Sequence, residues 1–184
     1  MNAPAQRWKL TIEYDGTGYV GWQRQDNGMS IQAALEEAAG NLCQMPIIMH
    51  GCGRTDAGVH AFAQVAHCDM PEKLTAQNLL GGLNFYLGDH KIAVHQVEQV
   101  AADFHARHHA RMRYYCYRLR LCATTKAAIQ QKKMWHVRDS LDMEAMQKAA
   151  RALVGQHDFE SFRAAECQAK SALRTLDRLE IIKA

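Results

Sequence analysis

The first half of the chain shows two kinds of hydrophobic spacing, which predict strands and helices in turn. Apolar and polar residues alternate at 8–14 and 91–100, and a short apolar run at 47–49 follows Pro46. These segments and residues 61–68 are predicted to be strands. Helical spacing follows Ser30 and Thr75, residue types that cap helix N-termini. The predicted order is βαββαβ, the ferredoxin-like split βαβ unit.

Each of these elements is expected to bury one side. The first helix should run from Ser30 to about Cys43, with its apolar residues on one face (Ile31, Ala34, Leu35, Ala38 and Leu42). The second helix carries Leu79, Leu80 and Leu83. In the strand at 91–100, strict alternation places Ile92 and Val94 on one side and Ala93, His95 and Val97 on the other.

The second half begins to repeat this order. A strand is predicted at 111–121, a helix follows Asp142 as its cap and ends at Gly155, and a last strand is predicted at 173–182. We therefore predict an α+β fold of two ferredoxin-like halves, 1–105 and 106–184, that form a mostly antiparallel sheet with helices on one face. The second half is incomplete in this order, so the chain is expected to be a fragment.

Composition narrows the class of protein without deciding it. The chain has 184 residues and a formal net charge of +3, too small by itself to indicate a nucleic-acid partner. It contains no apolar run long enough to cross a bilayer, and Met1–Arg7 lacks the apolar core of a secretory signal. The six cysteines are therefore expected to be reduced thiols in a cytoplasmic protein.

The charge distribution says more than the net charge. No acidic residue lies between Asp103 and Asp139, whereas that interval contains nine basic residues: Arg107, Arg111, Arg113, Arg118, Arg120, Lys126, Lys132, Lys133 and Arg138. A segment of one sign attracts phosphates. The alternative is a solvated basic segment balanced by acids elsewhere in the fold.

A glycine-rich stretch, Gly53–His60, is the strongest candidate for chemistry. It reads Gly-Arg-Thr-Asp-Ala-Gly-Val-His, and glycines allow close approach of a polynucleotide backbone. Arg54 is placed to stabilise the ionised form of Asp56 and lower its pKa, and such a carboxylate can act as a nucleophile or as an electrostatic stabiliser. The alternative is an ordinary surface turn with an Arg–Asp contact.

Aromatic residues lie within the acid-free segment. Alternation along the predicted strand puts Arg113, Tyr115 and Tyr117 on one face, where tyrosine can stack on a base and hydrogen-bond to it. The alternative is that both tyrosines are cross-strand packing residues.

Spacing argues against metal and nucleotide cofactors. Cys52, His60, His67 and Cys68 are close in sequence but lack the spacing of a zinc site, and His67 and Cys68 would point to opposite faces of a strand. Gly16-Thr17-Gly18 lacks the Gly-Lys-Ser/Thr of a P-loop. Neither a metal site nor a P-loop is therefore expected.

Together these motifs resemble those of the tRNA pseudouridine synthase A family. The resemblance covers nearly the whole chain and is carried by six segments: Glu13–Gly16, Gly21–Gln25, Gly53–His60, Asp103–Arg107, Arg113-x-Tyr115-x-Tyr117 and Asp158-Phe159-x-Ser161-Phe162. The family continues beyond the position of Ala184 with a strand and a helix that include a further active-site arginine, and it usually has a proline soon after the position of Asn84. Neither feature is found in this chain.

The resemblance implies a homodimeric isomerase that converts uridine to pseudouridine at U38, U39 and U40 in the tRNA anticodon stem-loop, without metal or organic cofactor. Asp56 matches the essential aspartate, Arg54 its partner and Tyr115 the tyrosine that stacks on the base. Arg24, Arg107, Arg113, Tyr117 and His60 are expected to bind the substrate. No membrane or DNA partner is expected.

Two other function classes fit parts of the sequence. A ferredoxin-like sheet can bind RNA without altering it, but a pure binder has no need of a carboxylate such as Asp56 near phosphates. A metal-dependent hydrolase is the second alternative. Glycoside hydrolysis needs a paired general acid, and Gly53–His60 contains no second carboxylate.

Overall fold

The computed structural model describes residues 5–122, 128–163 and 171–183. The chain divides into two compact units: Met1–Arg118 with Gln130–Met134, and Leu119–Ile129 with Trp135–Ala184. Lys126 of the basic segment and Cys167 lie outside the described residues. The predicted domains 1–105 and 106–184 stay a prediction.

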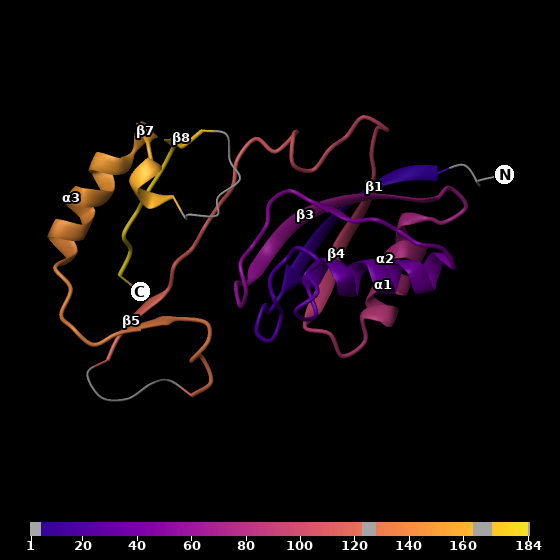
Figure 1. The fold of residues 1–184 in the computed structure, drawn as a ribbon, viewed down its shortest axis with the longest axis horizontal. Coiled ribbons are helices and arrows are strands. Elements are labelled where there is room, and N and C mark those ends of the chain that lie inside the picture. Colours follow the sequence, from indigo (N-terminus) through magenta and orange to yellow (C-terminus); the bar gives the residue numbers. More distant parts are fainter. Residues whose placement is uncertain (1–4, 123–127, 164–170, 184) are drawn as a thin grey trace. The chain divides into compact units, whose positions relative to one another are not determined.

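The first unit has the predicted element order. It comprises β1 (Ala5–Tyr14), α1 (Ile31–Cys43), β2 (His50–Gly51), β3 (Ala61–Pro71), α2 (Ala76–Leu87) and β4 (Ile92–Gln99). The sheet order is β2-β3-β1-β4, and each neighbouring pair is antiparallel. Figure 1 shows α1 and α2 side by side next to this sheet, and they contact each other.

The core lies between the sheet and these two helices. Leu10 and Ile12 of β1 are fully buried, and so are Leu35 of α1 and Leu79 and Leu83 of α2. They belong to one cluster that also takes in residues from β3 and β4. Alternation in the strands and helical spacing in α1 and α2 thus bury the predicted faces, because each element presents its apolar side to the same interior.

Both predicted helix caps are confirmed. The Ser30 Oγ accepts a hydrogen bond from the Ala33 amide at 3.0 Å, and the Thr75 Oγ1 accepts one from the Asn78 amide at 3.2 Å. These bonds satisfy donors that have no partner inside the helix. Ser30 is itself fully buried, so its cap also removes an unpaired amide from the interior.

The strand β4 departs from strict alternation. Leu10 of β1 pairs with Val97, but Ile12 pairs with Val94, so β4 contains one extra residue at this point. Such a bulge reverses the facing of the residues beyond it. The prediction that the Val97 side chain points to the other face of the strand from Ile92 and Val94 was therefore wrong. All three side chains are buried in the core.

The strand predicted at 47–49 is displaced. Ile47 and Met49 are buried as expected, but the strand β2 consists of His50 and Gly51, which pair with His67 and Ala66 of β3. The apolar residues thus enter the core just before the chain reaches its hydrogen-bonding partner.

Residues 101–109 pack against the sheet next to β1 and β3. The Arg7 guanidinium donates to the Phe104 carbonyl at 3.1 Å, and the Ala106 amide donates to His67 Nδ1 at 3.2 Å. The His67 ring stacks on His50 with 4.9 Å between ring centroids and lies 4.6 Å from the ring of His105. His67 is almost completely buried; burial, together with the neighbouring positive groups, lowers its pKa to about 4.

The second unit contains short elements. They are β5 (Leu119–Leu121), β6 (Trp135–Val137), α3 (Met143–Leu153), β7 (Gly155–Asp158), the 3-10 helix η1 (Glu160–Phe162) and β8 (Leu173–Leu176). β5 and β6 are parallel, whereas β7 and β8 are antiparallel. Asp142 caps α3 as predicted: its Oδ1 accepts from the amides of Glu144 and Ala145, both at 3.0 Å. Gly155 follows the helix with a φ of +111°.

Two predicted strands of the second half are much shorter than expected. Of residues 111–121 only Leu119–Leu121 form a strand, and of residues 173–182 only Leu173–Leu176 do. Residues 111–118 are exposed and, within the described ranges, no strand pairs with them; an extended segment needs such a partner to become part of a sheet. The α+β class is confirmed, whereas the ferredoxin-like nature of both halves stays a prediction.

Candidate active site

The Gly53–His60 stretch forms a loop between β2 and β3. The Val59 amide donates to the Asp56 carbonyl at 3.2 Å, which closes a turn over residues 56–59. Gly58 has a φ of +78° at its third position, a conformation that glycine adopts without steric cost. The Asp56 side chain is exposed. The loop therefore presents this carboxylate to solvent.

The start of the loop is fixed from two directions. The Cys52 amide donates to the Val65 carbonyl at 2.7 Å, and Gln64 Nε2 donates to the Gly53 carbonyl at 2.7 Å, so β3 holds both residues. The Arg113 guanidinium donates to the Cys52 carbonyl at 3.0 Å. One basic residue predicted to bind substrate thus reaches the loop that carries Asp56.

Thr55, which precedes Asp56, is held through both its backbone and its side chain. Its carbonyl accepts from the Trp22 amide at 2.9 Å, and its Oγ1 lies 2.8 Å from the hydroxyl of Tyr14. Tyr14 and Trp22 are both buried, with 2% of each exposed, and their ring centroids are 6.1 Å apart. Burial raises the pKa of Tyr14, although hydrogen bonds to Thr55 and Gln64 oppose this, so the phenol keeps its proton at neutral pH.

Glycines outside the loop let other segments approach it. A Cβ added to Gly16 would overlap the Val59 carbonyl, and one added to Gly21 would lie 2.7 Å from the Thr55 carbonyl. A Cβ on Gly51 would lie 2.5 Å from the Trp22 ring. The chain between β1 and α1 therefore packs against the Asp56 loop at distances that only a residue without a side chain permits.

His60 closes the loop through a small polar network. Its Nδ1 lies 3.0 Å from Asp15 Oδ1, its Nε2 lies 2.9 Å from the Lys132 carbonyl, and Lys133 Nζ lies 3.3 Å from Asp15 Oδ2. Burial alone would raise the pKa of Asp15, but hydrogen bonds from Thr17 and Lys133 and the nearby His60 hold it well below its usual range. This network ties residues 130–134 to the end of β1.

The remaining predicted site residues have varied surroundings. Arg24 forms an ion pair with Glu36 of α1, at 2.6 Å. Arg54 and Arg107 are exposed. Tyr115 and Tyr117 are 78% and 86% exposed, in the segment that was wrongly predicted to be a strand. Their roles, like those of Asp56, Arg113 and His60, stay predictions.

Two residues of the site had no role in the sequence reasoning. Tyr14 and Trp22 belong to motifs that carry the family resemblance, but their spacing from Thr55 in the sequence gives no sign of contact. The available signal was that the Trp22 segment is rich in glycine, as the Asp56 loop is. Glycines in both segments favour close approach of two backbones, although they do not say which partner each segment meets.

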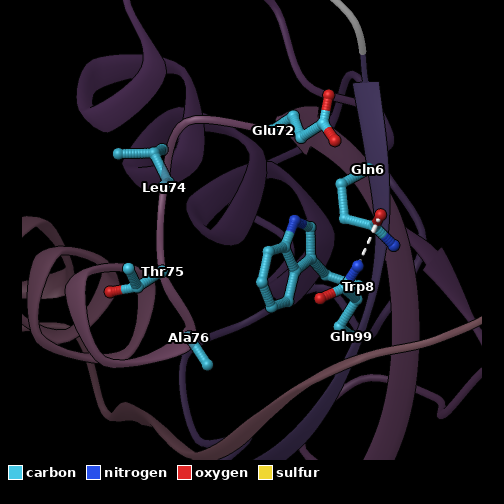
Figure 2. Close-up of a pocket in the computed structure, with 7 residues that line it drawn as sticks. All are labelled: Gln6, Trp8, Glu72, Leu74, Thr75, Ala76 and Gln99. Atoms are coloured by element: carbon cyan, nitrogen blue, oxygen red, sulfur yellow. Dashed lines mark hydrogen bonds between the residues drawn. The ribbon is translucent and has the colours of Figure 1, made fainter.

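A pocket lies at the other end of β1. It is lined by Gln6, Trp8, Glu72, Leu74, Thr75, Ala76 and Gln99, with Gln99 Nε2 donating to Gln6 Oε1 at 2.8 Å (Figure 2). Tyr14 lies six positions after Trp8 along the strand, which corresponds to roughly 20 Å. None of the predicted site residues lines this pocket, so we place the candidate active site at the Asp56 loop.

No group of three or more His, Cys, Asp or Glu side chains in the described ranges could hold a metal ion. No helix within those same ranges has the length and apolar character needed to cross a membrane.

The family model and three relatives that match this chain all bear the description tRNA pseudouridine synthase. A sequence model described as tRNA pseudouridine synthase matches residues 10–109 and 149–184, which together are more than half of the chain. Tyr115 lies between these two segments. The chain is 53% identical over 178 residues to the tRNA pseudouridine synthase A of Rhodospirillum centenum, covering 97% of this chain and 72% of that protein.

Two further relatives bear the same name. The Rhodospirillum rubrum protein is 49% identical over 177 residues, covering 96% of this chain and 63% of that protein. The Paramagnetospirillum magneticum protein is 48% identical over 177 residues, covering 96% of this chain and 69% of that protein. The chain thus spans about two thirds of the length of these relatives.

Proposed function

Because the chain belongs to the tRNA pseudouridine synthase family, we propose that it isomerises uridine to pseudouridine in the tRNA anticodon stem-loop, at U38, U39 and U40. The observation that carries the proposal is the exposed Asp56 carboxylate, presented by a loop that is held at Gly53 and Thr55 before Asp56 and at His60 after it. A catalytic group of this kind must be accessible to the substrate and yet held in place.

The reaction breaks the C1′–N1 bond of uridine, turns the base and joins C1′ to C5. The hydrogen on C5 is lost and N1 gains a proton, so the change is an isomerisation that consumes no oxidant, reductant or water. The base must first leave its stack to expose C1′. Water must be kept from C1′ while the bond is open, because hydrolysis would leave an abasic site.

Three residues carry the chemistry in this proposal. Asp56 promotes departure of the base, either by attack on C1′ or by assisting removal of the 2′ proton through a glycal. Arg54, two residues earlier in the same loop, is the proposed partner of this carboxylate. Tyr115, whose ring is 78% exposed, supplies a face on which the flipped base stacks.

The remaining binding residues follow from their charge and exposure. Arg24, Arg107 and Arg113 contact phosphates of the stem-loop, with Arg113 next to the catalytic loop through its bond to Cys52. Tyr117 and His60 complete the binding surface. We also propose that the protein acts in the cytoplasm and as a homodimer, the latter as the family resemblance implies.

The substitution Asp56→Asn tests the proposal. It removes the charge and keeps the shape, so conversion of an unmodified tRNA transcript should fall at least about a thousandfold, as expected when an activated nucleophile or stabilising charge is lost. The dissociation constant for the transcript should change by less than about threefold, because a carboxylate contributes no attraction to phosphates. Pseudouridine mapping and a filter-binding titration provide the two measurements.

Asp89→Asn is the matched control. Asp89 is also an exposed aspartate on a loop of the first unit, so it tests the same loss of charge away from the site and should keep wild-type conversion. Near-normal conversion by Asp56→Asn would remove Asp56 from the catalytic role. Pseudouridine at positions other than U38, U39 and U40 would correct the proposed target.

A further inference from the structure

We infer that Tyr14 is a positioning residue for the isomerisation: its buried hydroxyl, bonded to Thr55, fixes the backbone next to Asp56. The inference rests on the proposed function, because it concerns the placement of the proposed catalytic carboxylate. The Tyr14 hydroxyl lies 2.8 Å from Thr55 Oγ1, and Asp56 is the next residue along the chain.

Thr55 is held by two hydrogen bonds, which together we call the Thr55 clamp. The first is the bond between the Tyr14 and Thr55 hydroxyls. The second is the hydrogen bond from the Trp22 amide to the Thr55 carbonyl, at 2.9 Å. One bond holds the peptide plane that joins Thr55 to Asp56, and the other holds the side chain of Thr55. Together they determine the direction in which the chain leaves Thr55, and hence where the Asp56 side chain begins.

The Tyr14 side chain, one partner in the bond between the two hydroxyls, is held rigidly. Tyr14 is the last residue of β1 and pairs with Ala61 of β3 and with Ile92 of β4. Its ring is 2% exposed and packs near the Trp22 ring. Since a buried aromatic side chain between two neighbouring strands has few alternative rotamers, its hydroxyl is a fixed point to which an otherwise exposed loop is attached.

The clamp has a stronger effect on the reaction than on folding. Thr55 and Asp56 contribute no apolar side chain to the core cluster, so releasing them leaves the core intact. A misplacement of about 1 Å at a catalytic group can lower the rate about a hundredfold. Loss of one of the two bonds is therefore expected to lower the catalytic rate without a comparable effect on substrate binding.

The test begins with Tyr14→Phe, which removes only the hydroxyl. We expect kcat for an unmodified anticodon stem-loop RNA to fall by about tenfold or more, with KM unchanged within about twofold. Tyr19→Phe is the matched control, because the Tyr19 hydroxyl bonds to His90 at 3.0 Å rather than to the loop, and it should keep wild-type kcat. Equal kcat for Tyr14→Phe and wild type would overturn the inference.

Substitutions of Thr55 test the partner atom. Thr55→Val has the same shape without the hydroxyl and should match Tyr14→Phe, whereas Thr55→Ser keeps the hydroxyl and should restore most of the rate. The double variant Tyr14→Phe/Thr55→Val should be no slower than Tyr14→Phe, because Tyr14→Phe already removes the bond between the two hydroxyls, along with the bond to Gln64. Multiplying losses in the double variant would show that the two hydroxyls act separately and would also overturn the inference.

Hydrogen exchange gives a readout independent of activity. In Tyr14→Phe, the amides of Trp22 and Val59 should exchange faster, since they donate to the carbonyls of Thr55 and Asp56, while amides within β1 and β3 should keep wild-type protection. If the wild-type chain forms no pseudouridine, the proposed function fails, but the exchange comparison still tests the clamp. Unchanged exchange at both amides would overturn the inference.

Discussion

At the scale of single residues, the absence of side chains shapes the candidate site as much as the side chains do. Gly16 is buried against the loop, and a Cβ there would overlap the Val59 carbonyl. That carbonyl belongs to the backbone, which cannot turn aside as the end of a flexible side chain can. The amide of the same residue, Val59, closes the Asp56 turn, so any displacement of Val59 also moves the loop that carries Asp56.

Gly16→Ala is therefore expected to move the Asp56 turn. We predict a loss of about 1–3 kcal/mol in the free energy of unfolding from overpacking, and a fall in kcat of at least about tenfold from misplacement of the carboxylate. Denaturant unfolding and the pseudouridine assay measure the two effects.

Gly81→Ala is the control for Gly16→Ala. A Cβ on Gly81 of α2 would meet no atom within 4 Å, so alanine there should raise the free energy of unfolding by about 0.5–1 kcal/mol, because it favours the helix, and should leave kcat unchanged. Equal stability of Gly16→Ala and wild type would mean that the loop and the β1–α1 connection can separate without cost.

At the scale of elements, the first unit depends on how well its helices begin. Ser30 caps α1 from a fully buried position and bonds to the Ala33 amide at 3.0 Å. The Ile31 amide, next in the chain, donates to the Gly21 carbonyl, so the start of α1 is also attached to the segment that contacts Thr55. The start of the helix thus supports the site as well as the core.

Ser30→Ala should lower the free energy of unfolding of the first unit by about 1–2 kcal/mol, at the upper end for an N-cap, because it leaves a donor unpaired near the interior. Fluorescence of the buried Trp8 and Trp22 during denaturant unfolding measures this change. Glu37→Ala, at an exposed position of the same helix, should stay within about 0.5 kcal/mol of wild type. A similar loss in both variants would mean that the cap is not its cause.

Local chemistry explains which elements could be predicted from the sequence. The caps at Ser30, Thr75 and Asp142 act within three residues, so a short window contains all the information. The burial of Val97 depends on a bulge in its pairing with β1, which no property of residues 91–100 reveals. In the same way, residues 111–118 have the alternation of a strand, but pairing depends on residues far away in sequence.

In the candidate site, too, features that are local in the sequence could be predicted, whereas contacts between distant residues could not. Gly53–His60 could be singled out because its glycines and its lone carboxylate are adjacent in the sequence. The contact of Tyr14 with Thr55 spans 41 residues, and it exists because β1 ends where the loop after β2 passes. Only the three-dimensional arrangement of the sheet brings these two hydroxyls together.

At the scale of the whole molecule, the stability of the first unit should depend on pH through His67. This ring accepts a hydrogen bond from the Ala106 amide and lies among His50, His105 and Arg7, while the nearby Asp69 carboxylate acts in the opposite direction. Its pKa is lowered from 6.5 to about 4, mainly by burial. Protonation would remove the acceptor at Nδ1 and add a charge next to other positive groups.

The sign of the effect follows from proton binding. Above about pH 7.5 the ring is neutral in both folded and unfolded chains, so it contributes no pH dependence. As the pH falls from 6.5 towards 4, the unfolded chain takes up a proton that the folded chain excludes, and stability decreases through this window. Below about pH 4 the folded ring is protonated as well, and the loss no longer grows.

We therefore predict that the first unit loses roughly 1–2 kcal/mol of unfolding free energy between about pH 7.5 and about pH 5, since one pKa unit corresponds to about 1.4 kcal/mol and nearby solvent screens part of the charge. Tryptophan fluorescence during denaturant unfolding at the two pH values measures this loss. His67→Asn keeps an acceptor for the Ala106 amide without a titrating ring, so its stability should depend less on pH even if it is lower overall. His95→Gln, at an exposed position of β4, should keep the wild-type dependence. If His67→Asn loses as much stability as wild type over this range, the acid sensitivity arises from other groups. His67 would then contribute to packing but not to the pH dependence of stability.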